Sequence, residues 1–315
     1  MVNSWWMSWQ IDYLLYLQNL REVSHHIFDR FFLIITMFGE ITIPIIIITL
    51  FYWVLNKRAG QLMLWSYIFG FILNFAAKIT ACIYRPWILD TRIKPVPEAI
   101  PAATGYSFPS GHTAGVMSVW GSLALSFWNN KFVRYISVAI IFLVMFSRNY
   151  LGVHTPQDVI VSFVLSCFVI WGANRLIDWE SNGKNRDLII TLSLFVLTAL
   201  VLAYSFIKGY PIQYLFGKVL YDPASVKIST LCHSGFLFGA FAGWIFEKRY
   251  VDFQPQTGSV IKKIIRFAIG MLILFGIDST VKNLQLGICV QFIQYSILGL
   301  FVTFIYPFMV KKFNL

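Results

Sequence analysis

The stretch ITIPIIIITLFYWVL, residues 41–55, decides the fold class, because it carries no charged side chain. Lys57 and Arg58 follow it almost directly. A second run of the same character, YISVAIIFLVMF, occupies residues 135–146. Long apolar runs that end in basic residues are typical of transmembrane helices, so the sequence predicts a membrane protein.

The composition of the whole chain supports this prediction. Of its 315 residues, 58% are hydrophobic and 12% are charged, whereas soluble domains carry about 25% charged residues. The four cysteines lie in apolar stretches without a CxxC spacing, so we expect neither a disulfide nor a zinc site. The net charge of +11 comes from Lys and Arg residues between the apolar runs. This arrangement favours the lipid bilayer as a partner and no nucleic acid.

Windows of about 20 apolar residues mark nine candidate spans. They lie near residues 32–55, 61–83, 112–128, 135–150, 157–176, 187–207, 228–246, 264–281 and 286–309. Lys and Arg residues gather in alternate connections, so the positive-inside rule places the N-terminus outside and the C-terminus inside. The predicted fold class is therefore all-α, a polytopic transmembrane helical bundle of about nine spans, with eight or ten as alternatives.

Three parts of the chain differ in character. Residues 1–30 precede the spans and place Leu14 and Leu17 at helical spacing, which predicts an amphipathic helix at the outer interface. Residues 31–180 hold three clusters of polar residues and form the predicted catalytic core. Residues 181–315 add further transmembrane helices.

The first cluster, KITACIYRP at residues 78–86, holds two cations. A spacing of seven places Lys78 and Arg85 on roughly the same helical face, and Pro86 predicts that the helix ends there. Lys as a point charge and Arg as a planar fork suit a phosphate. The alternative is that both side chains only reach the membrane interface.

The second cluster, PSGHT at residues 109–113, opens the third predicted span. Pro, Ser and Gly at a helix start expose backbone N–H groups, which form an anion site together with the helix dipole. Gly111 allows close approach to the backbone, and His112 is placed to give or take a proton. A plain helix cap would explain Ser110 but not the whole set.

The third cluster, SRNYLGVHTPQD at residues 147–158, adds Arg148 as a third cation. Thr155 and Asp158 also fit a capping box, which is a structural alternative for the acid. A carboxylate in the first turn can reach the ring of His154. It would then fix the imidazole tautomer and raise its nucleophilicity.

Together the clusters offer three cations and two histidines on one side of the membrane. Charge in phosphoryl transfer spreads over the phosphoryl oxygens and is stabilised by cations and N–H donors. The chain has five histidines but no HExxH or paired-carboxylate pattern. We therefore expect a metal-independent phosphatase without a cofactor.

Glu40 is an acid inside the first predicted span. A charged residue at this depth is a functional candidate, because burial in lipid is costly. From the sequence alone we favour a structural hydrogen bond for it.

The three clusters resemble the signature of the type 2 phosphatidic acid phosphatase superfamily: Lys-x6-Arg-Pro, Pro-Ser-Gly-His and Ser-Arg-x5-His-x3-Asp. Every position of this signature is filled in order, within roughly residues 30–178. The resemblance implies a helical membrane core with its site at the outer leaflet.

The same resemblance implies a role for each residue. His154 would attack phosphorus, and Asp158 would orient its ring and stabilise its charge. His112 would protonate the leaving oxygen and then activate the water that hydrolyses the phosphohistidine. The phosphoryl oxygens would be held by Lys78, Arg85, Arg148, Ser110 and the N–H of Gly111.

The implied substrate is a membrane lipid, either a phosphatidate-like phosphomonoester or a polyprenyl diphosphate. The implied location is the plasma membrane, with the site on the extracytoplasmic side. A sugar-phosphate phosphatase is the alternative, because the additional spans are similar to the glucose-6-phosphatase branch. Such an enzyme would need a polar vestibule, which Trp87, Asp90, Arg92 and Glu98 would line. A lipid phosphotransferase or a phosphate-binding transporter is the alternative of another class. The sequence sets no oligomeric state.

Overall fold

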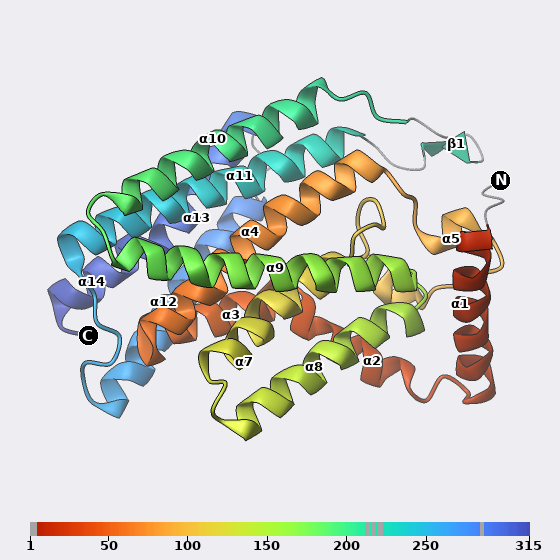
Figure 1. The fold of residues 1–315 in the computed structure, drawn as a ribbon, viewed down its shortest axis with the longest axis horizontal. Helices are drawn as coiled ribbons and strands as arrows, with labels where there is room; N and C mark the ends of the chain where they lie inside the picture. Colours follow the sequence, from red (N-terminus) through yellow and green to blue (C-terminus); the bar gives the residue numbers. More distant parts are fainter. Residues whose placement is uncertain (1–4, 212–213, 216–217, 220–222, 284–286) are drawn as a thin grey trace. The chain divides into compact units, whose positions relative to one another are not determined.

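The computed structural model describes residues 5–211, 214–215, 218–219, 223–283 and 287–315 (Figure 1). The chain divides into two compact units, which are described separately. The first comprises Met1–Ile45 and Leu62–Asn174, and the second comprises Ile46–Gln61 and Arg175–Leu315. Helices α3, α4 and α9 begin in one unit and end in the other. The predicted boundaries at residues 30 and 180 stay a prediction.

Helices build the first unit. In chain order they are α1 (Trp5–Val23), α2 (Asp29–Thr36), the short η1 (Met37–Gly39), α3 (Thr42–Leu50), α4 (Lys57–Ala81), α5 (Pro86–Leu89), η3 (Pro97–Ala99), α6 (Gly111–Val116), η4 (Met117–Gly121), α7 (Ser122–Ser126), α8 (Lys131–Tyr150) and α9 (Pro156–Ser181).

The second unit is also helical. Its elements are η2 (Phe51–Leu55), α10 (Arg186–Ile207), β1 (Tyr214–Leu215), β2 (Lys218–Val219), α11 (Pro223–Phe246), η5 (Glu247–Val251), α12 (Val260–Asn283), α13 (Ile288–Leu300), η6 (Phe301–Ile305) and α14 (Tyr306–Phe313). The two antiparallel strands have two residues each and are the only strands in the described part of the chain. The predicted all-α class is therefore confirmed.

Six helices among the described residues are long and apolar enough to cross a membrane: Lys57–Leu89, Lys131–Tyr150, Pro156–Ser181, Arg186–Ile207, Lys227–Val251 and Cys289–Phe313. Asp29–Gly39 and Thr42–Leu55 form a pair bent by 49°, and they make a seventh if they cross as one span. These helices confirm an integral membrane protein. The predicted spans 112–128 and 264–281 are not among them, so the count of nine and the orientation of the termini stay predictions.

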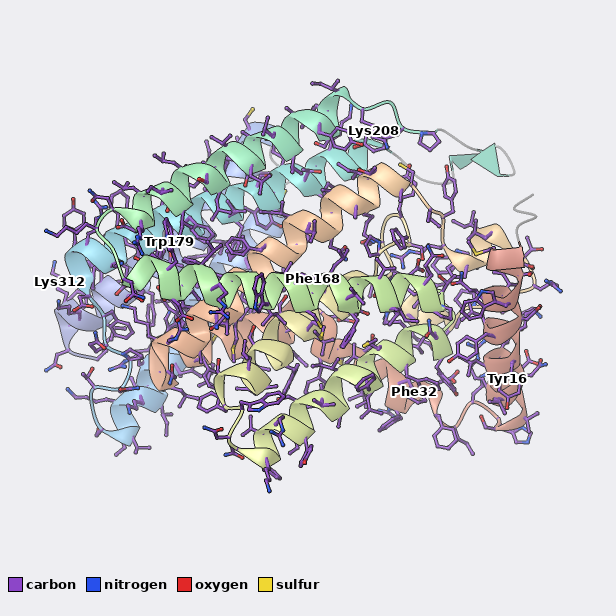
Figure 2. All side chains as sticks on the ribbon, viewed as in Figure 1. Tyr16, Phe32, Phe168, Trp179, Lys208 and Lys312 are labelled. Carbon is purple, nitrogen blue, oxygen red and sulfur yellow. The ribbon has the colours of Figure 1, made fainter. Side chains whose placement is uncertain are left out.

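An apolar core holds the first unit together around the site. It is made by residues of α6, η4, α8 and α9, namely Val116, Met117, Ile141, Val144 and Ile170. On the other side of α9, large apolar side chains face outward, and Phe168 is 65% exposed (Figure 2). An exposed apolar surface of this kind suits contact with lipid chains.

The predicted N-terminal amphipathic helix forms as α1, although residues 1–4 lie outside the described part. Its apolar face packs inside the first unit, where Leu14 and Leu17 are buried and Leu14 shares an apolar cluster with Ile93. Nη2 of Arg21 donates to the carbonyl oxygen of Lys94 at 2.5 Å. Helix α1 thereby fixes the loop after α5, and its place at the membrane interface stays a prediction.

Candidate active site

The first cluster leaves its helix earlier than the spacing predicts. Helix α4 ends at Ala81, and Cys82 has a left-handed backbone with φ +49°. Arg85 then lies in extended conformation directly before α5. The prediction that Lys78 and Arg85 share one helical face is therefore wrong, because the left-handed residue turns the chain away before it reaches Arg85.

Both cations nevertheless converge, because they hold the same loop. Nζ of Lys78 donates to the carbonyl oxygens of Tyr106 at 2.7 Å and Pro109 at 2.8 Å. Nε of Arg85 donates to the carbonyl oxygen of Gly105 at 3.0 Å. Two charged side chains thus fix the loop that leads into the second cluster. The contact of Lys78 with a phosphate stays a prediction.

Ser110 caps α6, and its Oγ accepts a hydrogen bond from the N–H of Thr113 at 3.3 Å. Its own N–H donates to the carbonyl oxygen of Asp158 at 2.9 Å, and its carbonyl oxygen accepts from Oγ of Ser162 at 2.7 Å. The capping alternative for Ser110 is therefore realised. Gly111 is exposed, and no atom lies within 4 Å of the place a Cβ would take. A ligand can therefore approach the backbone here, although its contact with either residue stays a prediction.

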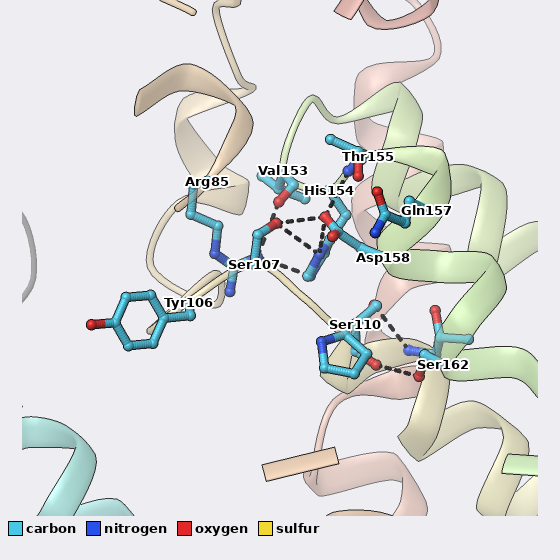
Figure 3. A network of polar contacts seen from close by, with 12 residues as sticks. Arg85, Tyr106, Ser107, Ser110, Val153, His154, Thr155, Gln157, Asp158 and Ser162 are labelled. Carbon is cyan, nitrogen blue, oxygen red and sulfur yellow. Dashed lines mark hydrogen bonds and ion pairs between the residues drawn. The ribbon is translucent and has the colours of Figure 1, made fainter. Parts of the chain in front are cut away.

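His154 and Asp158 form a buried pair, each about 1% exposed (Figure 3). Nδ1 of His154 lies 3.2 Å from Oδ2 of Asp158. Oγ of Ser107 donates to the same Oδ2 at 2.6 Å and lies 3.3 Å from Nδ1 of His154. Nη1 of Arg85 lies 2.8 Å from Nε2 of His154. Because a guanidinium only donates, Nε2 carries the lone pair and Nδ1 carries the hydrogen. Nε2 is therefore the nitrogen whose lone pair could act as a nucleophile.

Asp158 combines the two roles that the sequence left open. The N–H of Thr155 donates to Oδ2 of Asp158 at 2.8 Å, which is the reciprocal bond of a capping box at the start of α9. The same oxygen lies against the ring of His154. One carboxylate thus fixes both the helix start and the imidazole.

His154 lies in the turn between α8 and α9, and its surroundings favour the neutral ring. Burial lowers the pKa of His154 well below its usual value, and the positive charges of Arg85, Arg148 and Lys78 lower it further. A neutral imidazole with its Nδ1–H held by a carboxylate has the form that a nucleophile requires.

Arg148 comes from the last turn of α8 and is fully buried. Its Nη1 donates to Oγ1 of Thr36 at 2.6 Å. Its Nε and Nη2 have no hydrogen-bond partner among the described residues, and neither has Nε2 of His112. Buried polar atoms without a partner are rare, and the oxygens of a phosphoryl group would satisfy them. Arg148 therefore fits the predicted phosphate cradle, and His112 keeps a ring nitrogen open for its predicted proton transfer, although both roles stay predictions.

Glu40 also lies beside His112. Its Oε1 lies 3.6 Å from Nε2 of His112. The sequence indicated an acid at membrane depth, but it did not indicate this partner. No three His, Cys, Asp or Glu side chains of the described residues gather as a set of metal ligands.

Sequence reasoning missed three further residues of the site. Ser107 has no spacing signal, because a loop brings it to the His154–Asp158 pair. Asn74 Nδ2 donates to the carbonyl oxygen of Ser110 at 3.2 Å, and Ser162 binds the same oxygen. Asn74 and Ser162 are polar residues inside predicted apolar spans, and a search for such residues would have found them.

Comparison with known proteins identifies the family. Residues 59–182 match the PAP2 superfamily. Residues 231–315 match the PAP2 superfamily phosphatase, transmembrane extension. All three clusters lie within the first match, and the second lies in the segment that the sequence predicted as additional spans. The predicted likeness of that segment to the glucose-6-phosphatase branch stays untested.

Three curated proteins share part of their length with the chain. It is 29% identical over 156 residues to undecaprenyl-diphosphatase BcrC of Bacillus subtilis, covering 48% of this chain and 76% of that protein. It is 27% identical over 133 residues to an undecaprenyl-diphosphatase of Sulfolobus acidocaldarius, covering 42% and 61%. It is 37% identical over 82 residues to phosphatidylglycerophosphatase B of Escherichia coli, covering 23% and 31%.

The chain spans less than two thirds of the second and third of these relatives. No solved structure matches it at comparable significance. The two matched regions and the apolar helices nevertheless agree with the resemblance found in the sequence. The chain is therefore an integral membrane phosphatase with a PAP2 superfamily domain and a PAP2 transmembrane extension.

Proposed function

We propose that the chain hydrolyses the phosphate of a membrane lipid through a phosphohistidine at His154, with a polyprenyl diphosphate as the preferred substrate. The observation that carries this proposal is the buried His154–Asp158 pair, whose Nε2 faces a group of cations. The three relatives, two undecaprenyl-diphosphatases and one phosphatidylglycerophosphatase, support a lipid substrate.

In the first step, Nε2 of His154 attacks the terminal phosphorus and the bond from phosphorus to the leaving oxygen breaks. The leaving oxygen takes a proton from His112. The Nδ1–H of His154 stays on Asp158, whose negative charge stabilises the positive ring. Arg85 and phosphorus compete for the same lone pair on Nε2, so the guanidinium must turn to a phosphoryl oxygen as the bond forms.

In the second step, His112 takes a proton from water, and the resulting hydroxide attacks the phosphorus. The bond between phosphorus and Nε2 breaks, which releases inorganic phosphate and restores the neutral ring of His154. Arg148 and its open Nε and Nη2 donors would stabilise the equatorial oxygens in both steps. No metal takes part in this scheme.

The charges of the loop after α5 favour a lipid over a sugar phosphate. Nη2 of Arg92 lies 2.7 Å from Oδ2 of Asp90, and this contact lowers the pKa of the Asp90 carboxyl. The two side chains neutralise each other instead of offering separate polar contacts to a soluble sugar.

We further propose that the site faces the extracytoplasmic side of the plasma membrane. Helix α4 begins at Lys57 and Arg58, and Lys78 lies near its other end. Helix α9 begins beside His154, and basic residues follow its far end. By the positive-inside rule the ends of α4 and α9 next to the basic residues are cytoplasmic. The opposite ends of these helices, which carry the site residues, then lie outside.

The test is phosphate release by detergent-purified protein in EDTA. Polyprenyl diphosphate, phosphatidate and glucose 6-phosphate are compared at equal concentrations. We expect release from both lipids, fastest from the diphosphate, and little from the sugar phosphate. Release from glucose 6-phosphate alone would contradict the lipid assignment. Transfer of labelled phosphate to another lipid without release would favour a phosphotransferase.

A further inference from the structure

Glu40 lies at the break between the two helices of the bent pair, Asp29–Gly39 and Thr42–Leu55. η1 ends at Gly39 and α3 begins at Thr42, and between them the backbone of Glu40 is extended, with φ −79° and ψ 155°. An acid inside an unbroken apolar helix would face lipid or a neighbouring helix. The break lets this side chain leave the helix path.

Close backbone packing then brings this break to the second cluster. A Cβ at Gly39 would lie 2.5 Å from the carbonyl oxygen of His112, and a Cβ at Gly115 would lie 2.5 Å from that of Gly39. No larger residue fits at either position without movement. The two glycines therefore hold the break against α6, with Glu40 next to the contact.

The resulting contact is between a carboxylate and an imidazole. Oε1 of Glu40 lies 3.6 Å from Nε2 of His112, whose side chain is only 11% exposed. The side chain of Glu40 is 34% exposed, so it keeps access to solvent or ligand. Nε2 of His112 has no hydrogen-bond partner in the described part of the chain. Nε2 of His112, which would give or take the proton in catalysis, is therefore the atom that Glu40 faces.

The other charges around His112 are of one sign. The charges of Arg148 and Arg85 act on its ring, and a charge on His112 would act in turn on the ring of His154. Burial and the two guanidinium groups oppose a positive charge on the imidazole, whereas Glu40 favours it. Without this carboxylate, the imidazole would meet only cations and a bound phosphate.

We propose that Glu40 is a positioning residue that favours the protonated form of His112 for the departure of a poor leaving group, and so extends the substrate range to phosphomonoesters. This inference rests on the proposed function. The carboxylate stabilises the imidazolium before it gives its proton to the leaving oxygen, and again after it has taken a proton from water. These two proton transfers need no further reactant.

The leaving group makes the inference specific. A phosphomonoester such as phosphatidate releases an alcohol, whose oxygen needs a proton as its bond to phosphorus breaks. A polyprenyl diphosphate releases a phosphate monoester, which is stable as an anion. General acid catalysis contributes most where the leaving group is most basic. The loss on removing Glu40 should therefore be larger for the monoester.

The experiment compares Glu40→Gln with the wild type on phosphatidate and on a polyprenyl diphosphate, across pH. We expect kcat on phosphatidate to fall by about 10- to 100-fold, a part of the roughly 10²–10⁴ that a general acid supplies. On the diphosphate we expect a loss below about threefold. The basic limb of the phosphatidate profile should move to lower pH, since His112 then loses its proton more easily.

Asp29→Asn is the matched control. Asp29 forms another carboxylate–histidine pair in the same unit, 3.0 Å from Nδ1 of the exposed His26. Its amide variant should leave both activities within about twofold, with an unshifted profile. Glu40→Asp keeps the carboxylate but withdraws it, and should show a weaker form of the Glu40→Gln effect.

Equal losses on both substrates with an unshifted basic limb would overturn the inference and leave Glu40 with a structural role. If Glu40→Gln does not fold, an unshifted limb in Glu40→Asp would overturn it in the same way. A wild type inactive on every lipid phosphate would instead contradict the proposed function, so the two failures are distinguishable.

Discussion

Arg148 in the first unit and Arg266 in the second are both buried arginines, yet they use their donors differently. Nη1 of Arg266 donates to the carbonyl oxygens of Trp53 at 3.2 Å and Pro255 at 2.9 Å, and its Nη2 donates to that of Thr257 at 3.0 Å. The Arg148 side chain makes one hydrogen bond, to Thr36, and among the described residues its Nε and Nη2 have no partner, whereas Arg266 leaves only its Nε without one.

Two other cations of the second unit also have partners within it. Nζ of Lys57 lies 2.8 Å from Oε1 of Glu247, and Nε of Arg249 lies 2.8 Å from Oδ2 of Asp187. A buried charge without a partner is costly, and proteins keep one where function needs it. Lys57 and Arg249 of the second unit are thus paired with acids, whereas Arg148 of the first unit keeps donors without a partner among the described residues. This difference agrees with the proposed place of the chemistry in the first unit.

The largest effect is expected when the nucleophile is removed. His154→Ala leaves the cations in place but takes away the proposed nucleophile. Phosphate release from the polyprenyl diphosphate should fall by at least about 10³-fold. Release is measured in detergent with EDTA, and circular dichroism checks the fold. A folded variant that retains a tenth of the activity would contradict the role of His154.

The two arginines can be tested as a pair. Arg148→Met removes open donors, so kcat/KM should fall by about 10²–10³-fold while the melting temperature stays equal or rises. Arg266→Met leaves buried carbonyl oxygens without partners, at a cost of roughly 1–3 kcal/mol for each. Its melting temperature should fall while kcat/KM stays within about threefold. Thermal unfolding and initial rates are measured on the same preparations.

The opposite result for the two variants would contradict this difference between the arginines. A stable Arg266→Met variant with poor kcat/KM, beside an unstable but active Arg148→Met variant, would mean that open donors do not mark the site.

Ser107 is expected to have a moderate effect. Ser107→Ala removes the hydroxyl that donates to Oδ2 of Asp158. A hydrogen bond to a charged group contributes about 1.5–3 kcal/mol, so kcat should fall by roughly 10- to 100-fold with little change in KM. Ser107→Thr keeps the hydroxyl and should retain more of the rate. An unchanged kcat in the alanine variant would show that Asp158 needs no support.

The smallest effect concerns pH. Burial lowers the pKa of His154 in the folded protein well below the usual value, which is about 6.5. The unfolded chain takes up a proton on this ring below about pH 6.5, and the folded protein does not. Stability from this residue is therefore fully present above that pH and is lost as the pH falls, by up to about 1.4 kcal/mol per pH unit.

This slope is measured as the melting temperature from pH 8 to pH 5, in the wild type and in His154→Gln. We expect the wild type to lose more stability than the variant below pH 6.5. Parallel curves would mean that His154 takes up a proton in the folded protein.

The sequence indicated much of this architecture, because membrane helices and catalytic clusters are local patterns. Apolar runs gave the helices, and the spacing in SRNYLGVHTPQD placed Asp158 one turn from His154. The path between Lys78 and Arg85 was not predictable, because it depends on one left-handed residue, Cys82. The partner of Glu40 was not predictable either, since two glycines far apart in the sequence create that contact.

The central claim is that His154 becomes phosphorylated during turnover. The most direct measurement is rapid quenching with terminally labelled polyprenyl diphosphate in EDTA, followed by mass spectrometry of the protein. The account predicts an acid-labile, base-stable phosphate on His154 that forms before inorganic phosphate is released, and that is absent from His154→Gln. Full release with no label on the protein, or with the label on another residue, would contradict it.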